Sequence, residues 1–250
     1  MPDILTEALA TPGLLWLIVT IAAAGLVRGF SGFGTALIFV PVANIFIDPK
    51  QVIVVIALTG IASNAVILPR AWRQGSRAEV GLLVAAALLM VPLGLRALDY
   101  LDQITIRWII TAVAGGMLAA RILGWRYSRP VEGLALLGIG AAAGLIGGMT
   151  GLTGPVVVLF YLAGQAVAQS VRANTILFLA ALDVVLIANL TWQGAVTAEL
   201  LVLALILSIP YATTTLLGQR MFHPDYEKFY RSVAYGVIAL AVISGLPIWS

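Results

Sequence analysis

The chain alternates long apolar stretches with short polar segments. The apolar stretches run over Leu14–Ile47, Val52–Leu68, Val80–Leu98, Ile104–Leu123, Gly133–Ala163, Val171–Leu190, Leu200–Leu217 and Val233–Trp249. A transmembrane helix needs about 17–25 predominantly apolar residues, and all but the first and fifth stretches have that length. The pattern therefore predicts an all-α polytopic membrane protein, in which the first and fifth stretches are too long for one simple span.

A glycine-rich segment interrupts each of these two long stretches. The first is Gly25-Leu-Val-Arg-Gly-Phe-Ser-Gly-Phe-Gly34, and the second is Gly144-Leu-Ile-Gly-Gly-Met-Thr-Gly-Leu-Thr-Gly-Pro155. Glycine adopts positive φ and lets the backbone approach a ligand closely. We expect one helix to end and another to begin at each segment, near residues 33–35 and near residues 153–155. Glycine-broken segments at matching places in two halves point to the binding site of a transporter.

Over about sixty residues, the two halves of the chain align without gaps at a constant offset of 119 positions. The pairs that carry the match are Gly25 with Gly144, Gly29 with Gly148, Gly32 with Gly151, Gln74 with Gln193 and Gly75 with Gly194; Ser31 also aligns with Thr150, and Asn64 with Asp183. We therefore predict one integral membrane domain built from two membrane repeats, residues 14–124 and residues 132–249.

Basic residues between the apolar stretches predict the orientation. Arg70, Arg73 and Arg77 lie in one loop, other basic clusters lie at residues 121–129 and 220–231, and the loop at 188–198 has no Lys or Arg. If each broken segment enters the membrane and returns, all three basic clusters lie inside; if each crosses once, the 220–231 loop falls outside. The positive-inside rule favours the first arrangement. Each repeat is then a helical hairpin plus three transmembrane helices, and the two repeats are inverted because three is odd.

The broken segments are also the candidate substrate site. Two helix N-termini would meet near the midplane, each with unpaired N–H groups and about half a positive charge, which favours an anion. The candidate substrate-binding residues are Arg28, Gly29, Ser31, Gly32, Gly34, Thr35, Asn64, Gly148, Thr150, Gly151, Thr153 and Gly154. Arg28 has no basic counterpart in the second repeat, and a buried guanidinium group suits an oxyanion.

Two of these assignments have a structural alternative. Gly25 with Gly29, and Gly144 with Gly148, have the Gly-x-x-x-Gly spacing that lets helices pack closely. Asp183 lies well inside a long apolar stretch, where an ionisable side chain is by default a functional candidate. We expect it to couple transport to protons or substrate; the alternative is a structural hydrogen bond to a neighbouring helix.

Composition supports the membrane assignment and excludes several function classes. Of the 250 residues 61% are hydrophobic and 10% charged, and the mean hydropathy is +1.05, whereas a soluble domain has about 25% charged residues. The net charge of +3 reflects membrane orientation, so no nucleic-acid partner is expected. With no cysteine and one histidine, we expect no catalytic residues, no metal site and no cofactor. The N-terminal segment lacks the basic region of a signal peptide and is expected to be retained.

The two broken segments resemble a known family. Gly29-Phe-Ser-Gly-Phe-Gly34 and Gly147-Gly-Met-Thr-Gly-Leu-Thr-Gly-Pro155, each leading into a long apolar helix, resemble the paired signatures of the TauE/SafE sulfite exporter family, also called the toluene-sulfonate uptake permease family. Pro92-Leu-Gly94, followed by Arg107, is similar too. In the second half Tyr211 and Ala212 follow Pro210, where a glycine is expected.

This resemblance covers nearly the whole chain and implies a multi-pass secondary transporter of the bacterial inner membrane. The implied substrate is a small sulfur-containing anion, sulfite or an organosulfonate, carried by alternating access with H⁺ as a candidate coupling ion. A passive anion channel is the alternative, because the same helix ends would form a filter. A membrane enzyme and a non-transporting scaffold are further classes, and assembly as a homodimer in the lipid membrane is left open.

Overall fold

The computed structural model describes residues 2–102, 133–164 and 167–223, together with scattered positions between 104 and 123 and between 229 and 243. The helices of this part are α1 (Pro2–Leu9), α2 (Leu14–Ser31), α3 (Thr35–Ala43), α4 (Pro49–Gln74), α5 (Arg77–Tyr100), α7 (Leu134–Thr150), α8 (Gly154–Ala163), α9 (Ala168–Trp192) and α10 (Ala198–Met221). The described residues form no strand, which confirms the all-α class.

Five of the described helices are long and apolar enough to cross a membrane: α2, α4, α5, α9 and α10. The last four contain four of the predicted single spans. The other two predicted spans, Ile104–Leu123 and Val233–Trp249, lie largely outside the described residues. So do Arg107, the basic cluster at 121–129 and part of each predicted repeat.

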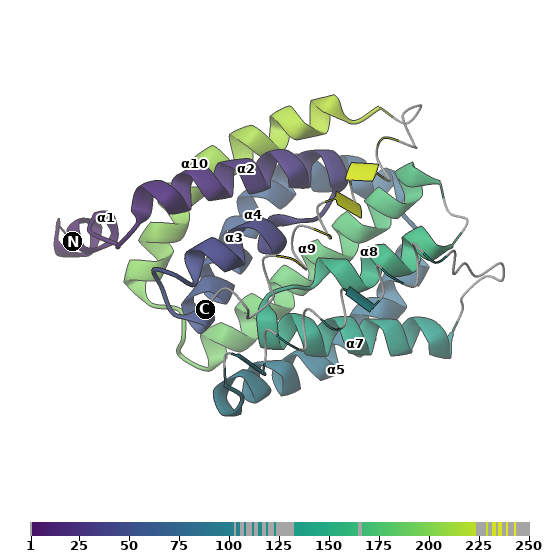
Figure 1. Ribbon diagram of the computed structural model, residues 1–250, viewed down its shortest axis with the longest axis horizontal. Helices are drawn as coiled ribbons and strands as arrows, with labels where there is room; N and C mark the ends of the chain where they lie inside the picture. The colour runs from purple at the N-terminus through teal and green to yellow at the C-terminus, as the bar shows by residue number, and fades with distance from the viewer. Residues whose placement is uncertain are drawn as a thin grey trace.

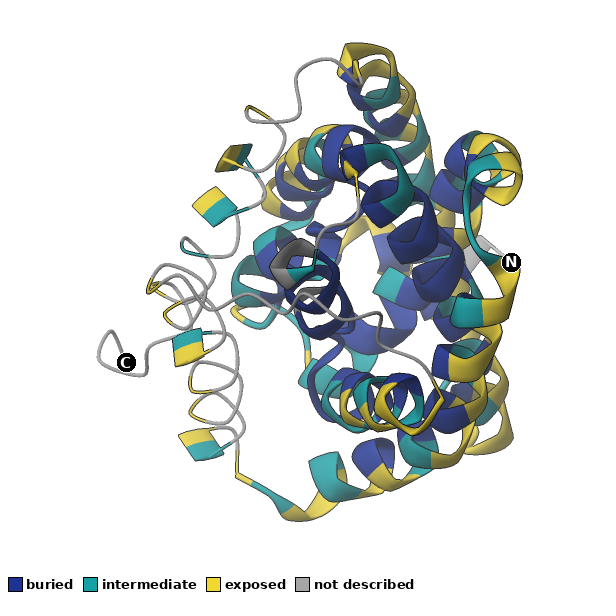
Figure 2. Ribbon diagram, turned by 90° about the vertical axis from the view of Figure 1, so that its right-hand side faces the viewer, coloured by how far each residue is buried: buried dark blue, intermediate teal, exposed yellow. Residues whose placement is uncertain are grey.

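Apolar side chains cover the outer faces of these helices. Leu89 on α5 and Ile209 on α10 are 71% and 70% exposed, and Val184 on α9 is 66% exposed. Figure 2 shows exposed positions on the outward faces of the bundle, with buried positions gathered between the helices. A water-facing surface would not carry so many large apolar groups on its spanning helices, so this face suits lipid.

Both long apolar stretches are broken where the glycines predict. Residues 32–34 separate α2 from α3 and form the first break; residues 151–153 separate α7 from α8 and form the second break. Gly32, Gly34 and Gly151 have φ angles of 86°, 102° and 71°, a left-handed region that costs other residues about 1–2 kcal/mol. In Figure 1, α3 runs back along α2, and α8 runs back along α7. Each pair is a helical hairpin.

Local signals explain where three of the spanning helices begin. Pro49 stands at the first position of α4, where its missing N–H group is not needed. The hydroxyl oxygen of Ser76 accepts a hydrogen bond from the N–H of Glu79 at the start of α5. Thr197 accepts one from the N–H of Leu200 at the start of α10. These bonds satisfy N–H groups that a helix start leaves unpaired.

The order of helices repeats along the chain. Adding the offset of 119 to the bounds of α2, α3 and α4 gives the bounds of α7, α8 and α9 to within one residue. The equivalent helices α4 and α9 pack antiparallel, because Gly60 of α4 lies against Asp183 whereas Gly75, beyond its far end, lies against Asn174. Contacts between α2 and α10, and between α5 and α7, are parallel instead.

Glycine builds the two closest helix contacts. The α2–α10 seam contains Gly25, Gly29 and Gly218, and the α5–α7 seam contains Gly94, Gly144 and Gly148. A Cβ atom on Gly29 would lie 2.8 Å from the nitrogen of Gln219, and one on Gly148 would lie 2.6 Å from the oxygen of Val91. Neither position has room for a side chain. The packing interpretation therefore accounts for the Gly-x-x-x-Gly pairs of both repeats.

The structure also locates the glycine that was expected after Pro210. A Cβ atom on Gly94 would meet the carbonyl oxygen of Leu145, and one on Gly218 would meet that of Leu26. Because Leu26 and Leu145 are equivalent in the two repeats, Gly218 is the counterpart of Gly94. The second half therefore has its counterpart glycine at Gly218 and not directly after Pro210. Gly218 lies five residues beyond the position that the offset of 119 gives for Gly94.

Gly218→Leu is expected to destabilise the protein by more than about 1–3 kcal/mol, because the new side chain would force α10 away from α2. The measurement is thermal unfolding of the purified protein in detergent. Gly81→Leu is the matched control: Gly81 is an exposed position of α5 with no atom within 4 Å of an added Cβ. Equal melting temperatures of the two variants would contradict the role of the seam.

Candidate functional site

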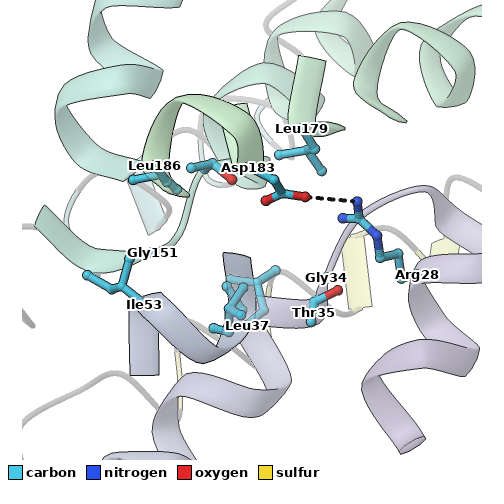
Figure 3. A pocket seen from close by; sticks show the side chains of 13 residues that line it. Arg28, Gly34, Thr35, Leu37, Ile53, Gly151, Leu179, Asp183 and Leu186 are labelled. Atoms are coloured by element: carbon cyan, nitrogen blue, oxygen red, sulfur yellow. Dashed lines mark ion pairs between the residues drawn. The ribbon is translucent and has the colours of Figure 1, made fainter. Parts of the chain in front are cut away.

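The two breaks face one cavity of about 30 Å³. Its polar lining is Arg28, Thr35, Thr153 and Asp183, its apolar lining is Ala36, Leu37, Ile53, Ile56, Leu179 and Leu186, and Gly34, Gly151 and Gly154 contribute backbone. Figure 3 shows Arg28 of α2 and Asp183 of α9 pointing toward one another. A polar space of this size holds about two water molecules.

Two helices begin at the cavity, one from each repeat. In α3 the N–H of Ile38 donates to the oxygen of Gly34, so the N–H groups of residues 35–37 precede the first turn of intrahelical bonds. Pro155 follows the first residue of α8 and removes one N–H group there. The start of α3 therefore offers more backbone donors than the start of α8.

Arg28, near the C-terminal end of α2, is the cation of the cavity lining. It is 4% exposed. Its Nε donates to the hydroxyl oxygen of Ser63 at 2.8 Å, and its Nη2 donates to Oδ1 of Asn64 at 2.8 Å. Nη2 also lies 3.8 Å from Oδ2 of Asp183. Both Ser63 and Asn64 come from α4, so this helix holds the guanidinium group in place.

Asn64 links the arginine to the carboxylate. Its Nδ2 donates to Oδ2 of Asp183 at 2.9 Å. The two residues are equivalent in the two repeats, so their contact places them where the repeats meet. Gly60 makes room for the carboxylate, since a Cβ atom there would lie 2.5 Å from Oδ2 of Asp183. The structural alternative for Asp183, a hydrogen bond to a neighbouring helix, is thus present together with an ion pair.

A second polar contact lies at the start of α3. The hydroxyl groups of Thr35 and Tyr211 are hydrogen-bonded, and Tyr211 of α10 is 1% exposed. A buried phenol normally finds such a partner. The bond ties the first turn of α3 to α10. It was not foreseen, because Tyr211 is one of several hydroxyl-bearing residues in its apolar stretch.

The hydroxyl groups of Ser31 and Thr150 finish helices α2 and α7 in the same way. Ser31 donates to the carbonyl oxygen four residues earlier at 2.7 Å and accepts from the N–H of Phe33 at 3.3 Å. Thr150 makes the equivalent bonds at 2.7 Å and 3.0 Å, the second with the N–H of Leu152. These hydroxyl groups shape the breaks, and neither residue lines the cavity.

Arg172 is a buried cation that the sequence analysis overlooked. It is 2% exposed, its Nε donates to the oxygen of Phe30 at 2.9 Å, and its Nη2 donates to the oxygen of Gly29. A cation at the C-terminal carbonyls of a helix is favourable, so Arg172 stabilises the end of α2. The sequence did contain a signal for this role, because Arg172 is a charged residue inside the apolar stretch that begins at Val171.

The structure brings together part of the predicted site. The residues that line the cavity are Arg28, Gly34, Thr35, Gly151, Thr153, Gly154 and Asp183, with Asn64 one hydrogen bond away. Gly29 and Gly148 lie in the helix seams, Gly32 lies in the first break, and Ser31 and Thr150 are the last residues of the helices that precede the breaks. In chemical terms the cavity offers one guanidinium group, two hydroxyl groups, helix N-termini and one carboxylate beside an apolar wall.

Comparisons with known proteins show the family of this chain. The family model described as "Sulfite exporter TauE/SafE" matches residues 17–245. A protein of Cupriavidus necator named "Probable sulfite/organosulfonate exporter TauE" is 27% identical over 237 residues, which cover 90% of each chain. No solved structure is significantly similar to this chain. Because the family model covers most of the chain, the protein belongs to the TauE/SafE sulfite exporter family, whose members are membrane transporters and not enzymes.

Proposed function

We propose that the protein is a secondary transporter that moves a small sulfur-containing anion across the bacterial inner membrane. The observation that carries this proposal is the cavity at which Arg28 and the N-termini of α3 and α8 converge. The name of the Cupriavidus relative includes sulfite and organosulfonate, and both are oxyanions of sulfur. An oxyanion is the ligand that a guanidinium group and helix N-termini favour.

In the proposed complex Arg28 and the N–H groups at the start of α3 hold the oxygen atoms of the anion. Thr35 and Thr153 add hydroxyl groups, while glycine at both breaks keeps the backbone accessible. The leucine and isoleucine side chains of the cavity lining form an apolar surface that suits the organic part of a sulfonate. Asp183 is the proposed site of the coupling proton, and Asn64 positions it relative to the arginine.

We propose that the two repeats have opposite orientations in the membrane. The antiparallel packing of α4 against α9 supports this. Three segments lie between α4 and α9: α5, the predicted span at residues 104–123 and the α7–α8 segment. If α5 and the predicted span each cross the membrane once, α4 and α9 run in opposite directions only when α7 and α8 together return to the side of the membrane from which they started. A single crossing of that segment would make α4 and α9 parallel.

Single cysteines test this orientation, because the chain has none of its own. In Gln74→Cys and Gln193→Cys, a membrane-impermeant maleimide added to intact cells is expected to label position 193 and not position 74. Both positions should react after the cells are lysed, which is the control for accessibility. Labelling of both cysteines in intact cells would contradict the inverted arrangement.

A carrier fits the cavity better than a channel does. Arg28 is 4% exposed and Thr153 is 8% exposed, so most of the site is withdrawn from water in this state. Alternating access requires such an occluded state, whereas a channel filter lines an open path.

The function is tested with purified protein in proteoliposomes. Labelled sulfite or methanesulfonate should enter in a saturable manner, and an excess of unlabelled anion inside should accelerate uptake by counterflow. Chloride is the control anion and should give no counterflow. Flux that rises linearly with concentration would identify a channel, and no flux of any sulfur oxyanion would overturn the proposed substrate class.

A further inference from the structure

The cavity carries two opposite charges that nearly balance one another. Arg28 contributes one positive charge and Asp183 one negative charge, at 3.8 Å. The other residues that line the cavity are threonine, glycine, alanine, leucine and isoleucine, and none of them is charged. With its carboxylate ionised, the side chains of the site therefore have no net charge, and only the helix N-termini remain to attract an anion.

The nearby titratable groups do not change this balance. Tyr211 faces the pair from α10 and is hydrogen-bonded to Thr35. From α4, the neutral Gly60 and Asn64 face the carboxylate. Arg172 lies on the same helix as Asp183, but its guanidinium group binds the C-terminal carbonyl oxygens of α2.

The nearest acidic residue on the neighbouring helix α5 is also remote. Nδ2 of Asn174 donates a hydrogen bond to Oε2 of Glu79 at 3.1 Å. Asn174 precedes Asp183 by nine residues in α9. At a rise of about 1.5 Å per residue, this places the glutamate contact about 13 Å along the helix. Among the described residues, Arg28 is therefore the countercharge of Asp183.

The carboxylate lies beside the space where a substrate oxyanion would bind. Bonds within the described residues use two of the five N–H donors of Arg28, one to Ser63 and one to Asn64. The carboxylate lies beyond direct hydrogen-bond distance, but still acts as the countercharge. A second negative group beside it would meet like-charge repulsion in surroundings of low dielectric constant, where charges must be compensated.

We propose that the site binds a singly charged oxyanion together with one proton on Asp183. Protonation removes the negative charge of the carboxyl group and leaves the charge of Arg28 for one monoanion. A dianion would retain one uncompensated negative charge in the cavity. For sulfite, the requirement for a single negative charge selects the hydrogen sulfite form. Among sulfonates, it selects those that carry one negative charge. This inference rests on the proposed anion site and adds its charge selectivity and its proton requirement.

The test is titration calorimetry of the purified protein with methanesulfonate, a monoanion, and with sulfate, a dianion. Between pH 7 and 9, the Kd for methanesulfonate should rise about tenfold per pH unit, since each binding event takes up one proton. Heats measured in buffers of different ionisation enthalpy should give the same proton count directly. Sulfate should bind at least about 100-fold more weakly than methanesulfonate, as expected for an uncompensated charge.

Asp183→Asn should bind methanesulfonate with a Kd that does not depend on pH and without proton uptake. Asp99→Asn is the matched control, because Asp99 pairs with Lys50 at the exposed ends of α4 and α5; it should keep the wild-type pH dependence. The pH dependence of the wild-type protein decides the question even if Asp183→Asn does not fold.

Binding without proton uptake, or sulfate binding as tight as methanesulfonate binding, would overturn this inference and leave the proposed anion site standing. A folded wild-type protein that binds no sulfur oxyanion at any pH would overturn both.

Discussion

Replacing Arg28 by glutamine is expected to weaken the binding of methanesulfonate at least about 100-fold, which corresponds to about 2.7 kcal/mol. Arg28 is the cation of the cavity lining, and a hydrogen bond to a charged group contributes about 1.5–3 kcal/mol. Glutamine keeps a polar, though shorter, side chain and removes the charge. Calorimetry at pH 7 measures the loss directly.

The same change is expected to lower the stability of the protein. It leaves the carboxylate of Asp183 buried with Asn64 and without its countercharge. Removing one partner of a buried ion pair costs about 3–5 kcal/mol. The melting temperature of Arg28→Gln in detergent should therefore fall well below that of the wild type.

A double variant separates the two effects. In Arg28→Gln/Asp183→Asn no charge remains in the cavity lining, so most of the lost stability should return. Binding should not return, because the anion still lacks its countercharge. A double variant that binds methanesulfonate as tightly as the wild type would show that Arg28 serves only to neutralise Asp183.

The two breaks were predictable from sequence because their cause is local. Gly32, Gly34 and Gly151 adopt positive φ, and a cluster of glycines inside an apolar stretch indicates such backbone. The offset between the halves then placed both breaks at equivalent positions. The starts of α3 and α8 followed from the same glycines, and the structure places them within the predicted positions.

Glycines required for helix packing could not be told apart from glycines required at the breaks. Gly29 and Gly148 were assigned to the binding site because they lie within the same motifs. In the structure they face α10 and α5, and an added Cβ would meet backbone atoms of these helices. That distinction depends on which helix lies opposite, which is a long-range property of the fold.

The partners of the charged groups were hidden for the same reason. Arg28 and Asp183 were each singled out by their positions in the apolar stretches, but their pairing through Asn64 requires α2, α4 and α9 to meet. The alignment held a clue, since Asn64 and Asp183 are equivalent in the two repeats. Equivalent residues contact one another only where the repeats meet, and the sequence alone does not say which positions those are.

Gly151→Leu is expected to abolish anion binding, whereas Gly151→Ala is expected to retain it. Gly151 lines the cavity, and a Cβ atom there would lie 3.4 Å from Ile53, which is an ordinary contact. Alanine therefore adds only backbone strain at φ 71°, about 1–2 kcal/mol. Leucine adds three further carbon atoms beside a cavity of about 30 Å³ and fills the space of the anion.

Gly194→Leu is the matched control for strain. Its φ of 69° is close to that of Gly151, and no atom lies within 4 Å of an added Cβ. It should lose stability by a similar amount to Gly151→Ala and still bind methanesulfonate with wild-type affinity. If Gly151→Leu also bound the anion normally while remaining folded, the anion would have to bind elsewhere, because the space beside the second break would be occupied by the new side chain.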